Sequence, residues 1–361
     1  MNASTKAAAL LLLGLACAPI RGEEPRPPAA AYEPYGLCAH LTWRRFYPTE
    51  PDVERALDLM KDAGVQWIRV GAEWLDLEPE DGKMDAEQQR RVDFVVDQSI
   101  RRGIRPYLQF IGTPRWASPK PQEPEFWSYA PTDLKAWARF VGRTAERYRG
   151  KVLFWEVNNE IDWPPFWKSG LPAYAAYLKE AAQELRRADP RNRVILGGLA
   201  TDGVHAFESG GRRAEADALP RLYDLGAGRD FDILGLHPYS QKADGVEISV
   251  AKVRTAYDVM KARGDAGKPI WCDEIGLSTN RNPPWSEWTE ADQARALTGA
   301  YDGLLKLPAV AKVFWYNFRC KGTDPASQED NFGIVNHDLS PRKAYAAFRD
   351  LPKLSQPPRK E

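Results

Sequence analysis

The sequence predicts an α/β fold, a (β/α)8 TIM barrel that forms a single catalytic domain, and three observations support this prediction. Eight short apolar runs of the kind that form buried strands alternate along the chain with helical patterns. Strict alternation implies parallel strands, because each return to the sheet needs a crossover helix. The eight units extend over residues 35–350 of the 361-residue chain, which is the size and count of such a barrel.

The eight strands follow one another at intervals that leave room for one helix each. The apolar runs lie at residues 35–41, 66–72, 104–111, 151–158, 193–198, 231–237, 269–275 and 310–316. Helical patterns lie at residues 51–63, 85–102, 131–149, 172–188, 211–226, 249–264, 289–306 and 341–350. The fifth unit is the weakest, because residues 201–230 are rich in Gly and Ala and are expected to be partly irregular.

Residues at the ends of the helical patterns agree with these bounds. Asp133 and Thr289 precede helical patterns and are suited to cap the first turn of a helix. Gly64 and Gly103 stand where helices are expected to end before the second and third strands, which favours a left-handed C-cap.

The N-terminus has the layout of a secretory signal peptide over residues 1–22, which predicts a secreted or periplasmic protein. Lys6 precedes an apolar stretch from Ala7 to Ala16, and this stretch is too short to span a bilayer. Cys17 offers an alternative as a lipid-anchoring site, although Gly14 stands where that motif usually has Leu. Residues 23–34 form a Pro-rich linker, residues 351–361 a C-terminal tail, and no second stretch reaches transmembrane length.

The composition argues against nucleic acid or an anionic membrane as a partner. Fifty basic residues balance 50 acidic ones, and no long block of like charge is present. The chain has 13 Trp and 14 Tyr, most of which are expected to fill the core. Several Trp nevertheless fall at strand ends or in loops, where a flat ring suits the face of a sugar. They are Trp43, Trp116, Trp127, Trp163, Trp167, Trp285, Trp288 and Trp315.

Three cysteines remain once a signal peptide is removed, and an odd number cannot pair completely. Cys38 belongs to the first strand and Cys320 follows the last, and these strands are neighbours in a closed barrel. Cys272 lies in the seventh strand. A Cys38–Cys320 disulfide and three buried free thiols are both compatible with the sequence.

Two glutamates carry the functional prediction. Glu160 and Glu274 each follow an apolar run, the fourth and the seventh strand, and they are 114 residues apart. In a barrel both side chains reach the mouth at the C-terminal face, where such barrels do their chemistry. A facing pair of carboxyl groups, one kept protonated and one kept ionised, is what cleavage of a glycosidic bond requires.

At these two glutamates the chain resembles the clan A retaining glycoside hydrolases, similar to families 39 and 5. WEVNNE at residues 155–160 is similar to their strand-four signature, and IWCDEIG at residues 270–276 to their strand-seven signature. The motifs IRV (68–70), GTPRWA (112–117), HPY (237–239) and FWY (314–316) follow in the corresponding order. The resemblance covers residues 35–350 and implies a (β/α)8 enzyme without a cofactor that acts on carbohydrate.

The resemblance also implies a role for each matching residue. Glu160 is implied as the acid/base, Glu274 as the nucleophile, and Asn159 as the group that binds the sugar 2-hydroxyl. Arg69 and Tyr239 are implied to hold Glu274 ionised and oriented. The remaining implied pocket residues are His237, His40, Trp116 and Trp315, with Trp315 as the platform beneath the sugar.

The chain departs from the relatives after the acid/base, where most have Pro and this sequence has Ile161. The absence of this proline is expected to affect the direction of the following loop and the geometry in which the substrate is bound.

Other acids compete with the pair, and each glutamate could instead be a structural ion-pair residue. Glu156 lies deeper on strand four and is expected to support the site. Glu73 is a rival acid, and so is Asp273, although strand alternation should turn Asp273 away from the pocket.

No metal site is expected from the four histidines, His40, His205, His237 and His337, because neither His-x-His nor His-Glu-x-x-His spacing occurs.

The sequence thus predicts a retaining glycoside hydrolase that cleaves β-glycosidic bonds by double displacement. The alternatives are a catalytically weak carbohydrate-binding barrel and a transglycosylase that uses the same pair. Arg281, Arg319 and Lys321 fit either an acidic glycan or plain surface charge. The sugar, the linkage, endo or exo action and the oligomeric state have no signature in the sequence.

Overall fold

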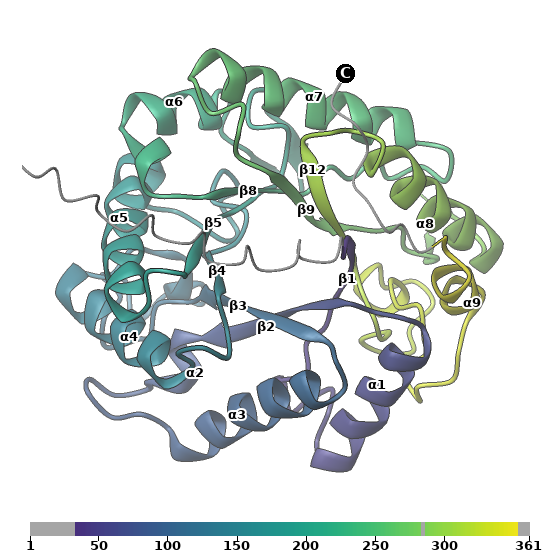
Figure 1. Cartoon of the computed structure of the whole chain (residues 1–361), viewed down its shortest axis with the longest axis horizontal. Coiled ribbons are helices and arrows are strands. Elements are labelled where there is room, and N and C mark those ends of the chain that lie inside the picture. Colours follow the sequence, from purple (N-terminus) through teal and green to yellow (C-terminus); the bar gives the residue numbers. More distant parts are fainter. Residues whose placement is uncertain (1–32, 283–285, 353–361) are drawn as a thin grey trace, which may run out of the picture. The chain divides into compact units, whose positions relative to one another are not determined.

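The computed structural model describes residues 33–282 and 286–352, and these residues contain a closed barrel of eight parallel strands ringed by helices (Figure 1). The expected signal peptide, Cys17, most of the linker, Trp285 and most of the C-terminal tail lie outside the described residues. The strands close in the order β1-β12-β9-β8-β5-β4-β3-β2. Their bounds are β1 Tyr35–Cys38, β2 Trp67–Glu73, β3 Arg105–Ile111, β4 Phe154–Val157, β5 Arg193–Leu199, β8 Ile233–Leu236, β9 Ile270–Ile275 and β12 Val310–Trp315.

A helix follows each barrel strand and packs on the outside of the barrel (Figure 1). The helices are α1 Glu50–Asp62, α2 Trp74–Leu77, α3 Ala86–Arg101, α4 Leu134–Arg147, α5 Gly170–Ala188, α6 Ala218–Asp224, α7 Val246–Ala262, α8 Glu290–Leu304 and α9 Lys343–Arg349. Short 3-10 turns lie at η1 Phe126–Ser128, η2 Ala227–Arg229 and η3 Glu329–Asn331. The predicted fold class is therefore confirmed.

The fifth unit is where the predicted elements differ from the structure. The helix expected over residues 211–226 begins only at Ala218, because residues 208–213 form a small antiparallel hairpin. Its strands are β6 Glu208–Ser209 and β7 Arg212–Arg213. A second small hairpin, β10 Arg281–Asn282 with β11 Ser286–Glu287, follows β9. Strands of two residues are too short to leave a periodic pattern, so neither hairpin could be predicted from the sequence.

The helix ends form as their residues predict. Asp133 caps α4 by accepting a hydrogen bond from the backbone of Lys135. Thr289 and Asp292 form a capping box at the start of α8. Gly64 and Gly103 have φ angles of 74° and 76°, a left-handed conformation that is costly for residues with a Cβ.

Each barrel strand sends alternate side chains to two different cores. On β9, Trp271 packs into an inner cluster inside the barrel, and Cys272 packs into the outer cluster between barrel and helices. On β12, Phe314 belongs to the inner cluster and Val313 to the outer one. The aromatic inner cluster fills the barrel below its C-terminal mouth, so the interior is packed rather than a pore.

The cysteines of the described residues are free, so the Cys38–Cys320 disulfide, one of the two alternatives, is not present in the structure. Cys38, Cys272 and Cys320 are all buried. The thiol of Cys38 donates to the backbone carbonyl of Asp273, at 3.3 Å. The sulfur of Cys320 instead accepts a hydrogen bond from Arg342, also at 3.3 Å. The two side chains thus have separate partners.

Among the described residues, none of the helices combines the length and the apolar character that crossing a membrane requires.

Candidate active site

A cavity of about 1540 Å³ opens at the mouth of the barrel, where the carboxyl ends of the parallel strands meet. It is bounded by residues from the ends of β1, β2, β3 and β9 and from the loops that follow all eight barrel strands. Six of the predicted site residues lie on its wall: His40, Arg69, Asn159, Glu160, Tyr239 and Glu274. The tertiary fold thus brings together residues that are up to 234 positions apart in the sequence.

Glu160 and Glu274 face each other in this cavity. One carboxylate oxygen of each lies within 4.8 Å of the other, and a ring nitrogen of His237 lies within the same distance of both. Both side chains are about 14% exposed, so they are largely shielded but open to the cavity. Strand β4 ends at Val157, and the backbone then turns through Asn158 and Glu160, whose φ angles are 73° and 39°. A positive φ is uncommon for glutamate and marks a strained turn that aims its side chain into the mouth.

Glu274 is held as an ionised carboxylate. Arg69 Nη1 donates to its Oε2 at 2.6 Å, and the Tyr239 hydroxyl donates to its Oε1 at 2.8 Å. Burial alone raises the pKa of this carboxyl, but the positive charges of His237 and Arg69 and the Tyr239 hydrogen bond outweigh burial and lower it. A carboxylate with both oxygens oriented and a lowered pKa is suited to act as a nucleophile.

Glu160 has the opposite environment. Burial raises its pKa, and the neighbouring Glu274 carboxylate adds to this effect. His237 Nδ1 lies 3.0 Å from Glu160 Oε1 and partly offsets the shift. Burial lowers the pKa of His237, but Glu274, Glu160 and Asp273 outweigh burial and raise this pKa to about 9. Two neighbouring carboxyl groups whose pKa values move apart are the arrangement expected of an acid/base and a nucleophile.

The expectation that His237 lines the pocket is wrong. Its ring is fully buried behind Glu160, with Nδ1 3.0 Å from Glu160 Oε1, and it has no surface for a sugar.

A buried polar network supports the two glutamates from below. Arg69 makes a two-pronged ion pair with Glu156, with N–O distances of 2.7 and 2.6 Å, and Arg69 Nη2 also donates to Asn159 Oδ1 at 2.7 Å. Gln109, which the sequence analysis did not single out, donates to Glu156 and Asn159, each at 3.1 Å. Because the Asn159 oxygen accepts from the Arg69 guanidinium and from the Gln109 amide, the Asn159 amide group is fixed in one orientation. Glu156 therefore has the supporting position expected of it.

Asp273 stays off the cavity wall as expected, but strand alternation, the expected reason, does not hold. Asp273 does not line the cavity, but its side chain points into the barrel, where Leu236 N donates to it at 2.8 Å and His237 Nε2 lies 3.6 Å away. Between two register pairs, Cys272 with Val313 and Ile275 with Trp315, strand β9 holds one extra residue. This β-bulge breaks the alternation, so two consecutive acids both face inward.

The expectation for Trp315 is wrong, because this residue does not form the platform beneath the sugar. Its side chain is 1% exposed and belongs to the outer core. Strand alternation on β12 places Phe314 inside and Trp315 outside, where its backbone N–H bonds the hydroxyl of Tyr301 on α8. The next residue, Tyr316, returns to the inner side and lines the cavity.

The expectation that Trp116 lines the pocket is also wrong. Its indole N–H donates to the backbone carbonyl of Glu78 at 2.8 Å, and its ring packs edge-on against Trp74. The turn after β3 thus directs Trp116 toward the outer core. Trp127, later in the same loop, lines the cavity instead.

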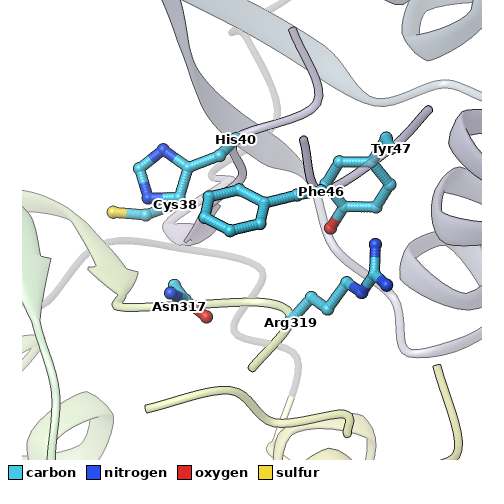
Figure 2. A pocket seen from close by; sticks show the side chains of 6 residues that line it. All are labelled: Cys38, His40, Phe46, Tyr47, Asn317 and Arg319. Atoms are coloured by element: carbon cyan, nitrogen blue, oxygen red, sulfur yellow. The ribbon is translucent and has the colours of Figure 1, made fainter. Parts of the chain in front are cut away.

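His40 lies between the large cavity and a small one of about 10 Å³. Figure 2 shows the side chains around the small cavity, which are Cys38, His40, Phe46, Tyr47, Asn317 and Arg319. The imidazole stacks on Trp43 with a centroid distance of 4.2 Å. Burial and the nearby charges of Lys321 and Arg69 hold the pKa of His40 well below its usual range. A neutral imidazole has one donor and one acceptor nitrogen, which suits a sugar hydroxyl.

Glu73, which the sequence marked only as a rival to the pair, is a further acid on the cavity wall. Its Oε1 accepts the indole N–H of Trp43, and its carboxyl group lies over Gly71, where a Cβ would come within 1.9 Å of that oxygen. Burial raises the pKa of Glu73 to about 7, against the Trp43 hydrogen bond that lowers it. The alternation of Arg69, Gly71 and Glu73 along β2 was the signal that could have found it.

Within residues 33–282 and 286–352, two groups of ligand-type side chains have their donor atoms within 4.8 Å of one another. They are Glu156, His237 and Asp273, and Glu160, His237 and Glu274. Arg69 already supplies a positive charge to Glu156 and to Glu274, so we interpret both groups as ion-pair clusters rather than metal sites.

A comparison with protein families matches residues 29–317 to the cellulase family, glycosyl hydrolase family 5. A comparison with curated proteins found no match.

Solved structures share the fold at low sequence identity. A family 39 glycoside hydrolase from the gut symbiont Bacteroides cellulosilyticus WH2 has a TM-score of 0.69 and 22% identity, over 88% of this chain and 63% of its own. A monomeric β-xylosidase from Caulobacter crescentus CB15 has a TM-score of 0.67 and 17% identity, over 88% and 67%. GH5_18 from Streptomyces cattleya, in complex with Manβ1-4GlcNAc, has 0.67 and 16%, over 88% and 79%.

The chain thus spans less than two thirds of the length of the first of these structures. The family match extends over most of the barrel, from the linker to the end of β12. The chain therefore belongs to the cellulase family, glycosyl hydrolase family 5.

Proposed function

We propose that this protein is a retaining glycoside hydrolase that cleaves β-glycosidic bonds of a poly- or oligosaccharide by double displacement. One observation carries the proposal: carboxylate oxygens of Glu160 and Glu274 lie within 4.8 Å of each other, and their pKa values shift in opposite directions. Retaining enzymes hold their carboxyl groups about 5–5.5 Å apart, whereas inverting enzymes leave room for a water between them.

In the first step, Glu274 attacks the anomeric carbon while Glu160 donates its proton to the departing glycosidic oxygen. The Arg69 and Tyr239 hydrogen bonds keep Glu274 ionised for this attack. In the second step, Glu160 takes a proton from water, which attacks the glycosyl–Glu274 ester and releases the sugar. The raised pKa of Glu160 suits both the acid and the base role.

Asn159 is the proposed partner of the sugar 2-hydroxyl. Arg69 and Gln109 bond its oxygen, which leaves its NH₂ group as the donor toward the cavity. A β-linked substrate is supported by the relatives, since one is named a β-xylosidase and another was crystallised with Manβ1-4GlcNAc.

The test is trapping of the covalent intermediate. Full-length protein is incubated with a panel of β-configured 2-deoxy-2-fluoro glycosides with good leaving groups, and its intact mass is measured beside Glu274→Gln. We expect a mass gain of one fluorosugar in the wild type alone, on the peptide that contains Glu274. Labelling of Glu274→Gln to the same extent, or full turnover by this variant, would reject the assignment.

Glu160→Ala is the matched control for the acid. It should lose activity on substrates with poor leaving groups and keep much of it on activated aryl glycosides, which need little protonation. Equal loss on both substrate classes would contradict the acid/base role.

We also propose that residues 1–22 direct export to the periplasm or the medium. The support is the charged and apolar pattern of Lys6 and residues 7–16. Cell fractionation, with N-terminal sequencing of the mature protein, tests this proposal.

A further inference from the structure

We propose that four aromatic residues, Trp127, Trp163, Phe166 and Phe207, form the subsite that binds the leaving-group sugar and any sugar acceptor. We name this set the aromatic wall. The inference rests on the proposed function, because it takes Glu160 as the acid and Glu274 as the nucleophile. All four residues line the cavity and are partly exposed to it.

The position of the aromatic wall follows from the strand order. Its residues come from the loops after β3, β4 and β5, which are three consecutive strands of the barrel (Figure 1). Glu160 lies on the central one of these loops, and Glu274 lies on β9, which is two strands beyond β5. A sugar attached to Glu274 therefore has Glu160 between it and the aromatic wall. The leaving group departs toward the acid that protonates it, and so toward the aromatic wall.

The aromatic wall consists of two ring pairs. Trp163 stacks on Phe207 with a centroid distance of 4.5 Å and an angle of 26° between the planes. Trp127 meets Phe166 edge-on at 5.8 Å. The backbone N–H of Trp163 donates to the carbonyl of Glu160 at 2.8 Å, so this ring is tied to the loop of the acid.

Polar contacts join the three loops that carry these rings. Glu125, in the β3 loop, bonds Lys168 of the β4 loop at 2.6 Å and Arg212 of the β6–β7 hairpin at 2.7 Å. The backbone N–H of Lys168 also donates to the carbonyl of Ser128, and that of Glu215 donates to the carbonyl of Asp162, each at 2.8 Å. The aromatic wall is thus a connected surface rather than four independent side chains.

The opposite side of the cavity has a different character. There, Glu73, Arg45 and Lys321 surround Trp43, whose ring has the Arg45 guanidinium 4.5 Å from its centroid. A charged and hydrogen-bonding surface suits the hydroxyls of the sugar that reacts. A half-exposed aromatic surface suits the apolar face of a sugar ring, whose identity it need not read.

The test compares two substrates that differ only in their leaving group. A glycosyl fluoride has no sugar in its leaving group, whereas a β-1,4-linked tetrasaccharide of xylose, mannose or glucose has one. In Trp163→Ala and in Phe207→Ala we expect kcat/KM for the tetrasaccharide to fall at least about tenfold. For the β-xylosyl, β-mannosyl or β-glucosyl fluoride we expect it to stay within about twofold, since its leaving group does not reach the aromatic wall.

Phe126→Ala is the matched control, because Phe126 precedes Trp127 on the same turn but does not line the cavity. Trp163→Phe is a conservative variant that should recover much of the lost kcat/KM. An equal loss on both substrates would show that the aromatic wall only shapes Glu160 and would overturn the proposal. The proposal would also be overturned if none of the variants changed kcat/KM for the tetrasaccharide.

A binding measurement keeps the test independent of catalysis. We expect the tetrasaccharides to change the intrinsic tryptophan fluorescence of the protein, and Trp163→Ala to weaken this binding by about tenfold. Unchanged affinity in Trp163→Ala, or no binding of any tetrasaccharide by the wild type, would overturn the proposal that the aromatic wall binds sugar. Failure of Glu274 labelling with this binding intact would instead reject the proposed mechanism alone.

Discussion

Arg69 and Glu274 are 205 residues apart in sequence, yet Arg69 Nη1 donates a 2.6 Å hydrogen bond to Glu274 Oε2 inside the barrel. The same guanidinium pairs with Glu156 and holds the oxygen of Asn159. One buried cation from β2 therefore orients groups on β4 and β9 at the same time. This explains why Glu274 stays ionised although burial alone favours its protonated form.

Tyr239→Phe should lower kcat by about 10- to 100-fold and leave the thermal midpoint nearly unchanged, because it removes one hydrogen bond to a carboxylate. Loss of this bond also raises the pKa of Glu274, so the acidic limb of the kcat/KM profile should move to higher pH. The measurement is a pH–rate profile of both proteins. Tyr257→Phe, on the outer helix α7, serves as a control and should change neither quantity.

His237→Gln should move both limbs of the pH–rate profile to higher pH. The charge of His237 lowers the pKa of Glu274 and its hydrogen bond and charge lower that of Glu160, so both pKa values rise when it is removed. Steady-state kinetics across pH 4–9 test this, with His205→Gln in an exposed loop as the control. Limbs that stay in place would show that His237 does not act on the pair electrostatically.

Glu73→Gln should stabilise the protein at neutral and alkaline pH but not at acidic pH. The folded-state pKa of Glu73 is raised to about 7, so the folded state binds a proton more tightly than the unfolded state does. Wild-type stability therefore falls as the pH rises from the ordinary glutamate value toward 7, by roughly 3 kcal/mol for a shift of this size. The variant lacks this loss.

Thermal melts of wild type and Glu73→Gln at pH 4.5 and pH 8 measure the difference. The control is Glu146→Gln, an exposed residue of α4 that pairs with Arg149. A stability difference that is the same at both pH values would contradict a buried, protonated Glu73.

Trp315→Ala should destabilise the fold by about 3–5 kcal/mol, the cost of a large cavity in the core, without a specific effect on the folded enzyme. Tyr316→Ala, one residue later, should lower kcat/KM because Tyr316 lines the active-site cavity. Denaturant melts together with active-site-normalised kinetics separate the two effects. The opposite pattern would mean that the ring that contacts the sugar is Trp315.

The sequence alone determined the fold class and the placement of Glu160 and Glu274 at the same face of the barrel. Eight apolar runs alternate with helical patterns, and this periodicity follows directly from which face of each element is buried. Glu160 and Glu274 end two of these runs, and parallel strands place such ends at the same face of a barrel. These inferences need only local pattern and topology, so they could be made without coordinates.

Only the tertiary structure decided which neighbouring side chains face the cavity. The bulge on β9 turns both Asp273 and Glu274 inward, and the alternation on β12 puts Tyr316 rather than Trp315 in the mouth. The phase of a strand depends on register shifts with its neighbours, which a single run of residues does not encode. The loops that carry Phe207 and Trp163 come from different strands, so their stacking also exists only in the closed barrel.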